Sequence, residues 1–467
     1  MTRLVARGTY VPRHRLDRAS VGIGHGTRSV ASYDEDTTSM GVAAARRALQ
    51  GATPRVPGSV IFSTSTPAYT DRTNATAIAE ALGLRTHVGA YDFNGSVRSA
   101  VGGFHAAADA AAAGRTAMLV AADIRTGLPG SSEERDGGDG AAALVFAPDG
   151  PCLAEVIATS AVSTEFLDRW RPPGAPVSHV WEERFGESVY VPLAAEALGQ
   201  ALVSAGLEPG DVHHLIVAGL HRRAVAGMGK AAGVRSGVLV DDRSDAIGVA
   251  GAAHAFLMLC DVLERAVPTE NIVVLVLADG ADCVVLRAGE LAGAPLPGPT
   301  VADAVCGPPV GHHDMLVWRG LLRREPPRRP DPDRPAAPPS HRGAAWKFGF
   351  TGTRCVECGT RHLPPQRVCH RCRAVDRMQS EGLAGLTGTV STFTVDHLAF
   401  SVAPPVVVVV VDLDGGGRLQ CELTDADHRD VRVGDRVELT FRRLYTTTDG
   451  VHDYFWKVRP LLDEESA

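Results

Sequence analysis

Two pairs of closely spaced cysteines constrain this chain more than any other feature of its sequence. Cys355 and Cys358 form one CxxC pair, Cys369 and Cys372 form a second, and ten residues separate the pairs. This spacing is typical of one tetrahedral zinc ion held by four thiolates. Because four protein ligands leave no open coordination position, we expect a structural Zn²⁺, with His370 as a bystander. The metal would supply most of the folding free energy of so short a segment, on the order of 10 kcal/mol in zinc-finger peptides.

The composition predicts several globular units in a reducing compartment. The chain has 467 residues, of which 45% are hydrophobic, and its nine cysteines are an odd number with four already in the zinc motif. A disulfide framework is therefore not expected. The opening residues Met1–Arg15 contain no apolar core of a signal peptide, and no run of about eighteen apolar residues follows. We expect a cytoplasmic protein without a membrane segment.

A proline-rich stretch divides the sequence into two compositions. Residues 323–342 contain a dense run of prolines, which lack a backbone N–H and restrict their predecessors, so we predict an extended linker without helix or strand. Before it, strand-like runs alternate with Ala-rich helical runs, which predicts an α/β domain. The predicted strands are Ser59–Ser63, Ala117–Ala121, Leu215–Ala218 and Ile272–Ala278, and the predicted helices are Thr38–Leu49 and Ser99–Ala113.

After the linker, strands rich in Val and Thr are separated by Gly and Asp, which predicts a small β-barrel. The predicted strands are Gly388–Val395, Val406–Leu413, Arg418–Leu423 and Arg436–Phe441. We interpret the six-valine run Val406–Val411 as a core strand buried on both faces.

The order of motifs in this second part resembles a known family. Trp346, the CVECGT and CHRC knuckles, and then GTVSTFTV, PPVVVVVVDLDGGGRL and VGDRVELTF resemble the zinc-ribbon/OB-fold proteins that accompany thiolases and HMG-CoA synthases in acyl-CoA complexes. Similar modules also bind nucleic acid. From Glu381 to Ala467, however, 8 Lys and Arg face 15 Asp and Glu, a net charge of −7 that would repel a phosphate backbone. We therefore expect no nucleic-acid partner.

The first 320 or so residues resemble archaeal-type HMG-CoA synthase and, more distantly, β-ketoacyl carrier-protein synthase III. The resemblance rests on Ser32–Thr37 (SYDEDT), Gly127–Gly130 (GLPG), Gly138–Ala142 (GDGAA) and Ile247–Gly251 (IGVAG). It implies the five-layered α/β thiolase fold with two similar halves, normally as a homodimer. The expected domains are two thiolase-like halves at 1–150 and 151–322, the linker at 323–342, a zinc ribbon at 343–380 and an OB-fold barrel at 381–467.

The same resemblance identifies candidate catalytic positions, and several carry unexpected residues. Ser96 stands where the family has its nucleophilic cysteine at the start of a helix, and His221 matches the family's catalytic histidine. The family's acid/base glutamate falls at Ser65, and the asparagine of its IGN turn falls at Val249. A serine is a weak nucleophile without a neighbouring base, and Ser96 could instead be only a helix N-cap.

Other residues near these motifs complete the candidate set. Five further cysteines lie in other segments and cannot replace the missing thiol. The arginines that flank the two motifs are usually solvated, although one could meet a CoA phosphate. The cysteines are Cys152, Cys260, Cys283, Cys306 and Cys421, and the arginines are Arg98, Arg222 and Arg223.

Two hypotheses for function follow. In the first, the protein is a transferase that acts on acyl-CoA or acyl-carrier-protein thioesters, with CoA or phosphopantetheine as the carrier, Ser96 as nucleophile and His221 as general base. The substituted positions argue against authentic HMG-CoA synthesis and favour an unusual condensation, or an O- or N-acyl transfer, in a specialised pathway. In the second, the chain is a catalytically silent acyl-binding or scaffold subunit that holds a thiolase-family partner.

Overall fold

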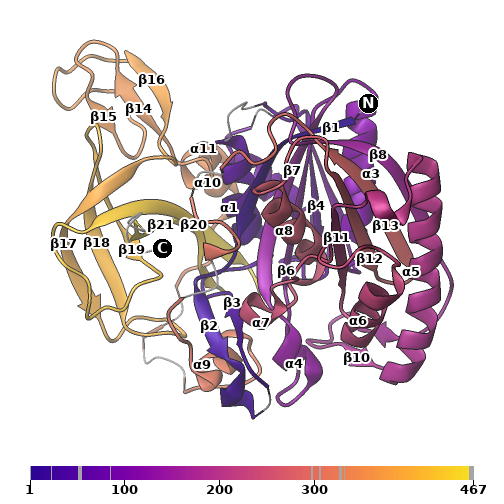
Figure 1. Cartoon of the computed structure of the whole chain (residues 1–467). Helices are drawn as coiled ribbons and strands as arrows, with labels where there is room; N and C mark the ends of the chain where they lie inside the picture. The colour runs from indigo at the N-terminus through magenta and orange to yellow at the C-terminus, as the bar shows by residue number, and fades with distance from the viewer. Residues whose placement is uncertain are drawn as a thin grey trace. The chain divides into compact units, whose positions relative to one another are not determined.

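The computed structural model describes residues 2–22, 24–50, 55–84, 86–295, 298–303, 307–325, 329–330 and 332–461 (Figure 1). The chain divides into two compact units. The first unit comprises Met1–Ala31, Ala43–Thr76 and His87–His312, and the second comprises Ser32–Val42, Ala77–Thr86 and His313–Ala467.

One mixed sheet, in the order β11-β12-β13-β8-β1-β7-β6-β4-β5, forms the frame of the first unit. Its two halves repeat one pairing pattern. In the first half, the parallel strands β4 and β6 are followed across the sheet by β7 and β1, which pair antiparallel. In the second half, the parallel strands β11 and β12 are followed in the same way by the antiparallel strands β13 and β8. The two halves join where β1 pairs with β8. The strands are β1 (Thr2–Tyr10), β4 (Ser59–Thr64), β5 (Gly89–Asn94), β6 (Ala117–Ile124), β7 (Asp139–Ala147), β8 (Ala154–Val162), β11 (His214–Gly219), β12 (Asn271–Leu277) and β13 (Ala281–Ala288).

Two buried helices, α3 (Ser99–Ala112) and α8 (Gly251–Leu263), form a common core with the sheet. Their sequences are rich in alanine and other apolar residues, so they can be buried nearly all round. A separate apolar cluster packs α5 (Glu183–Ala205) and α6 (Arg222–Ala231) against β11, β12 and β13. The remaining short elements are β2 (His14–Asp17), η1 (Arg18–Val21), β3 (Thr27–Val30), α4 (Ser132–Asp136), β9 (Arg169–Trp170), β10 (His179–Val180), η2 (Pro209–Asp211) and α7 (Ser244–Ile247).

Helices α1 (Thr37–Leu49) and α2 (Ala75–Ala81) each contribute residues to both units. Gly8 of β1 lies against the part of α1 that belongs to the first unit, where a Cβ would come within 2.2 Å of the Ala44 carbonyl oxygen. Only glycine fits at this approach. The predicted elements of the α/β domain are thus present in the structure, with ends that differ by at most three residues.

The second unit contains a ribbon sheet and a closed barrel. The ribbon consists of β14 (Thr351–Cys355), β15 (Arg361–His362) and β16 (Met378–Gly382), in the order β15-β14-β16. The barrel is formed by β17 (Thr387–Asp396), β18 (Val406–Leu413), β19 (Arg418–Leu423), β21 (His452–Pro460) and β20 (Arg436–Thr446), in that order. Strand β21 was not among the predicted strands. Helices α9 (His312–Trp318), α10 (Ala337–Arg342) and α11 (Ala344–Lys347) precede the ribbon.

Two expectations about this unit were wrong. The stretch predicted to exclude helix contains α10, in which Pro338 and Pro339 occupy the first turn. Prolines are tolerated there because those positions have no intrahelical N–H bond to lose. The valine strand β18 is not buried on both faces either, because Val408 and Val410 are half-buried between the buried Val407, Val409 and Val411. A barrel encloses only alternate side chains of each strand.

Residues 33–36, which come before α1 in the sequence, belong to the second unit and carry buried charges against its barrel strands. The Lys457 Nζ on β21 lies 3.0 Å from Asp34 Oδ2, and both side chains are fully buried. The Arg442 guanidinium on β20 forms ion pairs with Glu35 and, at 2.6 Å, with Asp425. The acidic SYDEDT motif thereby supplies counter-ions for two cations of the barrel.

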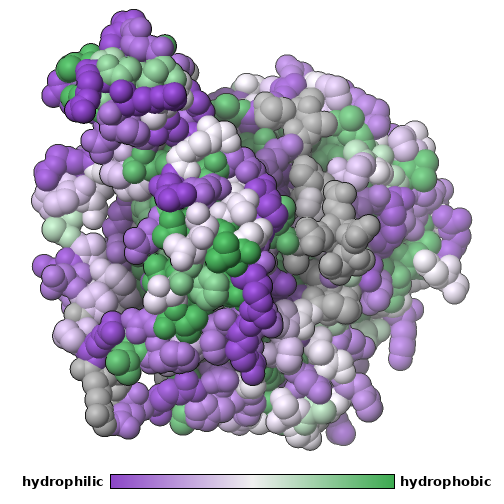
Figure 2. All heavy atoms as spheres, turned by 90° about the vertical axis from the view of Figure 1, so that its left-hand side faces the viewer, coloured by the Kyte–Doolittle hydropathy of each residue, from purple (hydrophilic) through white to green (hydrophobic). Residues whose placement is uncertain are grey.

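Figure 2 shows a face that is mainly hydrophilic, with small apolar patches between the hydrophilic atoms. Exposed apolar side chains of the second unit include Val356, Val368 and Leu398. In the part of the chain that is described, no helix combines the length and the apolar character needed to cross a membrane.

Candidate active site and metal centre

Ser65, Ser96 and His221 line one cavity of about 130 Å³ in the first unit. Ser65 follows β4, Ser96 follows β5, and His221 follows β11. Because β4 and β5 are parallel, the residues that follow them meet at one edge of the sheet, and the matching strand of the other half adds His221. The topology therefore brings together three positions that are far apart in the sequence.

Ser96 lies in the turn between β5 and α3, and it is half-buried. Helix α3 begins at Ser99, its N-cap is Arg98, and that cap makes no side-chain hydrogen bond. The interpretation of Ser96 as the helix N-cap is therefore wrong. Its backbone N–H donates to Ser99 Oγ at 3.4 Å, whereas the Ser96 hydroxyl has no hydrogen-bond partner among the described residues. The hydroxyl is thus available to a ligand in the cavity.

His221 is the N-cap of α6, and its side chain has a defined tautomer when neutral. The backbone N–H of Ala224 donates to His221 Nδ1 at 3.1 Å, so the proton of a neutral ring resides on Nε2. His221 is buried, and within the described structure Nε2 has no hydrogen-bond partner. A neutral His221 consequently offers the cavity a hydrogen-bond donor.

Asp168 and Tyr190 join His221 in the cavity lining, although no sequence motif marks either residue. Gly186 in the first turn of α5 makes room for the group, since a Cβ there would come within 2.6 Å of Asp168 Oδ1 and of His221 Nε2. Burial raises the pKa of Asp168, against the opposing effect of His221. Burial, and then the Asp168 carboxylate, raise the pKa of Tyr190. The site therefore contains a buried carboxyl group that takes up a proton more readily than an ordinary aspartate.

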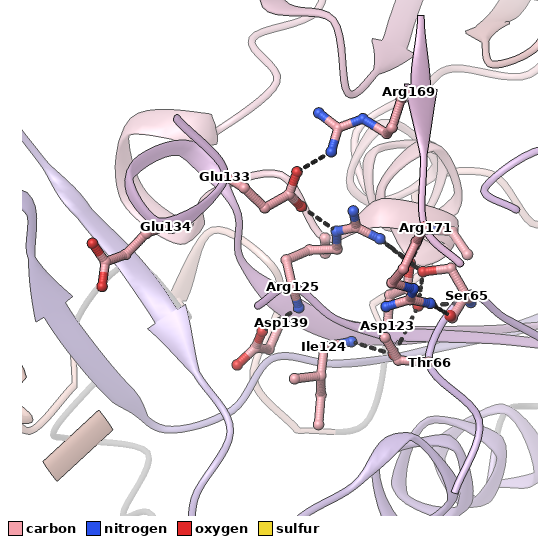
Figure 3. A network of polar contacts seen from close by, with 12 residues as sticks. Ser65, Thr66, Asp123, Ile124, Arg125, Glu133, Glu134, Asp139, Arg169 and Arg171 are labelled. Carbon is pink, nitrogen blue, oxygen red and sulfur yellow. Dashed lines mark hydrogen bonds and ion pairs between the residues drawn. The ribbon is translucent and has the colours of Figure 1, made fainter. Parts of the chain in front are cut away.

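The hydroxyl of Ser65 is fully engaged in a buried polar network (Figure 3). It lies 2.8 and 2.9 Å from the two carboxylate oxygens of Asp123, and it accepts a hydrogen bond of 2.7 Å from Arg125. Arg125 in turn donates to Glu133 at 2.6 Å. Burial alone would raise the pKa of Glu133, but Arg125 and Arg169 lower it to about 2. Ser65 is thus held in place and has no free proton for acid/base chemistry.

Arg171 lies beside this network and lines the same cavity. It donates to the backbone oxygen of Ser65, and no carboxylate of the described chain forms an ion pair with it. Burial lowers the pKa of Arg171, and the nearby Arg125 lowers it further. The segment that carries Arg169 and Arg171 has no periodic pattern and only the two-residue strand β9, so no sequence signal placed it here.

Val249 does not line this cavity. It is buried and borders a neighbouring cavity of about 190 Å³, which shares Asp168, Arg169 and His221 with the first. The Val249 N–H donates to the Asp136 carbonyl at 2.8 Å. Its apolar side chain cannot replace the hydrogen bonds of an asparagine.

The flanking arginines form ion pairs within the first unit. The pairs are Arg98 with Asp282, Arg222 with Asp242 and Arg223 with Glu187, at 2.8, 2.6 and 3.0 Å. Cys152, Cys260, Cys283 and Cys421 are buried outside the cavity lining, and Cys306 lies outside the described residues.

The four knuckle cysteines converge in the ribbon. Their Sγ atoms all lie within 4.8 Å of one another, with Cys355–Cys372 at 3.6 Å and Cys358–Cys369 at 3.5 Å. Tetrahedral zinc with Zn–S bonds of about 2.3 Å requires Sγ separations of roughly 3.8 Å, so the cluster fits this metal. His370 is exposed, and its ring packs against His362 with the centroids 4.7 Å apart.

Two comparisons define the class of the first unit. Hydroxymethylglutaryl-CoA synthase of Pyrobaculum neutrophilum is 29% identical over 300 residues, which cover 60% of this chain and 84% of that protein. The structure of 3-oxoacyl-(acyl carrier protein) synthase III from Pseudomonas aeruginosa superposes with a TM-score of 0.55 at 21% identity, over 62% of this chain and 98% of that one. The first unit therefore has the thiolase-like fold, and its sequence is similar to that of an HMG-CoA synthase.

Two further comparisons concern the barrel. The family model for the C-terminal OB-fold domain of ChsH2 matches residues 382–442. A DUF35 domain-containing scaffold protein of Methanocaldococcus jannaschii is 33% identical over 119 residues, which cover 25% of this chain and 84% of that protein. The chain belongs to the DUF35 family by this part, which is fused to a homologue of HMG-CoA synthase.

Proposed function

We propose that the protein transfers acyl groups from a CoA or acyl-carrier-protein thioester through Ser96, in a specialised pathway. The observation that carries the proposal is the shared cavity. Ser96, with a hydroxyl that has no partner in the described chain, lines it together with His221 and the buried carboxyl of Asp168. A nucleophile, a hydrogen-bond donor and a proton acceptor are the three groups that acyl transfer requires.

In the proposed step, Ser96 Oγ attacks the thioester carbonyl carbon. A C–O bond forms, the C–S bond breaks, and the carrier thiol leaves with a proton. The resulting ester on Ser96 then passes its acyl group to an acceptor. Carbon, oxygen and nitrogen acceptors all remain compatible with this step.

The geometry supports a different role for His221 from the general base expected from the sequence. A general base needs a free lone pair, but Nδ1 already accepts from Ala224 and a neutral Nε2 carries the proton. We therefore assign Nε2–H to the developing oxyanion of the thioester carbonyl. The proton of Ser96 then goes to Asp168, whose pKa is raised by burial, and from there to the leaving thiol.

The release of CoA thiol from acetyl-CoA, followed against pH, tests this assignment. Asp168 must be ionised to accept a proton, so the rate should rise with pH through a pKa above the ordinary aspartate value of about 4 and then level off. Asp168→Asn should lower the rate by roughly 10²–10⁴-fold, and His221→Gln by roughly 10²–10³-fold. A wild-type pH profile that Asp168→Asn reproduces would rule out Asp168 as the base.

A second candidate function is a silent acyl-binding or scaffold subunit. The replaced positions favour it, because the Ser65 hydroxyl is engaged by Asp123 and Arg125, and Val249 is apolar and buried. The M. jannaschii relative is a scaffold protein, which adds support for the barrel part alone. Binding of acetyl-CoA without thiol release or an adduct would favour this function.

The quaternary structure remains a prediction in either case. We propose a homodimer, with a thiolase-family partner as a further associate. Sedimentation of the purified chain at micromolar concentration tests the dimer, and a monomer would contradict it.

A further inference from the structure

Among the residues that line the cavity with Ser96 and His221, arginines outnumber carboxylates. Arg125, Arg169 and Arg171 all line it. The Glu133 carboxylate is shared between Arg125, at 2.6 Å, and Arg169. The third guanidinium, that of Arg171, has no carboxylate within ion-pair distance in the described chain. Figure 3 shows Arg171 directly beside Ser65, with Glu133 farther away.

The carboxylates near Arg171 are already occupied. Besides Ser65, Asp123 accepts hydrogen bonds from Thr64, Thr66 and the Ala252 N–H. Asp123 and Glu133 partly offset the lowering of the Arg171 pKa by burial and Arg125, but neither forms an ion pair with Arg171. Two other carboxylates, Asp168 and Asp279, line the cavity without an ion pair to Arg171. A half-buried guanidinium in this setting is unbalanced unless an anion binds.

The position of Arg171 indicates which anion. Its guanidinium donates to the backbone oxygen of Ser65, the position that corresponds to the family's acid/base glutamate. The guanidinium therefore lies where the acyl part of a thioester would react. A cavity of about 130 Å³ has room for a short acyl chain, whereas the nucleotide of CoA is several times larger.

We propose that Arg171 binds a free carboxylate on the acyl group, so that the substrates are short-chain dicarboxylic acyl thioesters. This inference rests on the proposed acyl-transfer function and specifies its substrate class. A guanidinium can bind a carboxylate through two parallel hydrogen bonds, which gives both charge and geometric recognition. Arg125 and Arg169 both form ion pairs with Glu133, which leaves Arg171 as the cavity arginine without a carboxylate partner among the described residues.

Calorimetric titration of the full-length chain with succinyl-CoA, butyryl-CoA and free CoA tests the proposal. Succinyl-CoA and butyryl-CoA have the same number of acyl carbons and differ in the terminal carboxylate. The wild-type protein should bind succinyl-CoA about tenfold or more tightly than butyryl-CoA. Arg171→Gln, which keeps an N–H donor for the Ser65 carbonyl, should remove this preference without weakening butyryl-CoA. Arg171→Lys should retain part of it, because it keeps the charge but not the paired donors.

Arg115→Gln is the matched control, since Arg115 is exposed and lies outside the cavity lining. Equal affinities of the wild type for the two esters, or a preference that survives Arg171→Gln, would overturn the proposal. Loss of free-CoA binding in Arg171→Gln would also overturn it, because Arg171 would then contact the carrier's phosphates. If neither ester binds, the proposed function itself fails, and this outcome differs from equal binding of both.

Discussion

At the scale of single residues, the cavity brings together three of the positions that the sequence resemblance identified, Ser65, Ser96 and His221. Ser96 is proposed as the nucleophile at the position expected for a thiol, and the Ser65 hydroxyl is bound by Asp123 and Arg125. His221 keeps its place but has its Nδ1 committed to the backbone of α6. Because Ser65 has no free proton, we propose Asp168, which lines the same cavity, as the acid/base group.

Ser65→Ala tests whether Ser65 has a structural or a chemical role. The substitution removes one buried hydrogen-bond partner from Asp123 and one from Arg125, so the free energy of unfolding should fall by about 1–3 kcal/mol. Acyl-adduct formation should persist, because the serine supplies no proton. Chemical denaturation and mass spectrometry measure the two effects.

Thr76→Ala is the comparison for this change, since the exposed Thr76 hydroxyl donates only to a local carbonyl and its loss should cost much less. An unaltered stability of Ser65→Ala together with a lost adduct would reverse the assignment.

At the scale of elements, the barrel depends on buried charge. The Lys457 Nζ lies between Asp34 and Glu422, at 3.0 and 2.6 Å. Burial alone would lower the pKa of Lys457, but these carboxylates hold it above its ordinary value. The lysine thus stays charged in the interior, and its loss would leave the buried Asp34 with Arg442, at 3.7 Å, as its remaining ion-pair partner in the described chain.

Lys457→Met should therefore lower the free energy of unfolding by about 3–5 kcal/mol, the usual effect of breaking a buried pair. Urea denaturation measures it. Arg418→Met removes the exposed pair with Asp412 on the same barrel and should cost at most about 1 kcal/mol. Equal effects of the two substitutions would show that the buried pair contributes no more than a surface pair.

The elements that the sequence predicted well are those with a strong local pattern. The β19 bounds Arg418–Leu423 agree fully, and α1 differs by one residue. The failures have physical causes. Pro338 and Pro339 were read as excluding helix, although a first turn accepts them, and the burial of β18 depends on barrel closure, which local composition does not reveal.

The residues of the candidate site also fall into those that a local sequence pattern predicts and those that it does not. Ser96 and His221 follow strands and sit in recognisable motifs, so their positions could be predicted. Asp168 and Arg171 come from an irregular segment whose path is set by tertiary contacts, such as the Arg171 bond to the Ser65 carbonyl. Their participation could be found only from the folded chain.

At the scale of the whole molecule, the chain joins a thiolase-type unit to a DUF35-type unit that the metal should help to fold. We predict one zinc per chain, held by Cys355, Cys358, Cys369 and Cys372. A chelator should unfold the ribbon and leave the first unit folded, because the short ribbon has little core of its own. Metal analysis and circular dichroism provide the measurements.

His370→Ala is the control for the zinc prediction, since His370 lies between two ligands but should not bind the metal. It should retain zinc, whereas Cys369→Ser should lose it. A zinc-free preparation with an ordered ribbon would contradict the assignment.

The central claim is that Ser96 accepts the acyl group, and intact-protein mass spectrometry after incubation with a panel of acyl-CoA esters tests it most directly. The wild-type chain should gain the mass of one acyl group, mapped to the peptide that contains Ser96, and Ser96→Ala should gain none while remaining folded. Ser96→Cys should also become acylated, because a thiol at this turn needs less help from a base. An adduct of equal yield on wild type and Ser96→Ala would contradict the account.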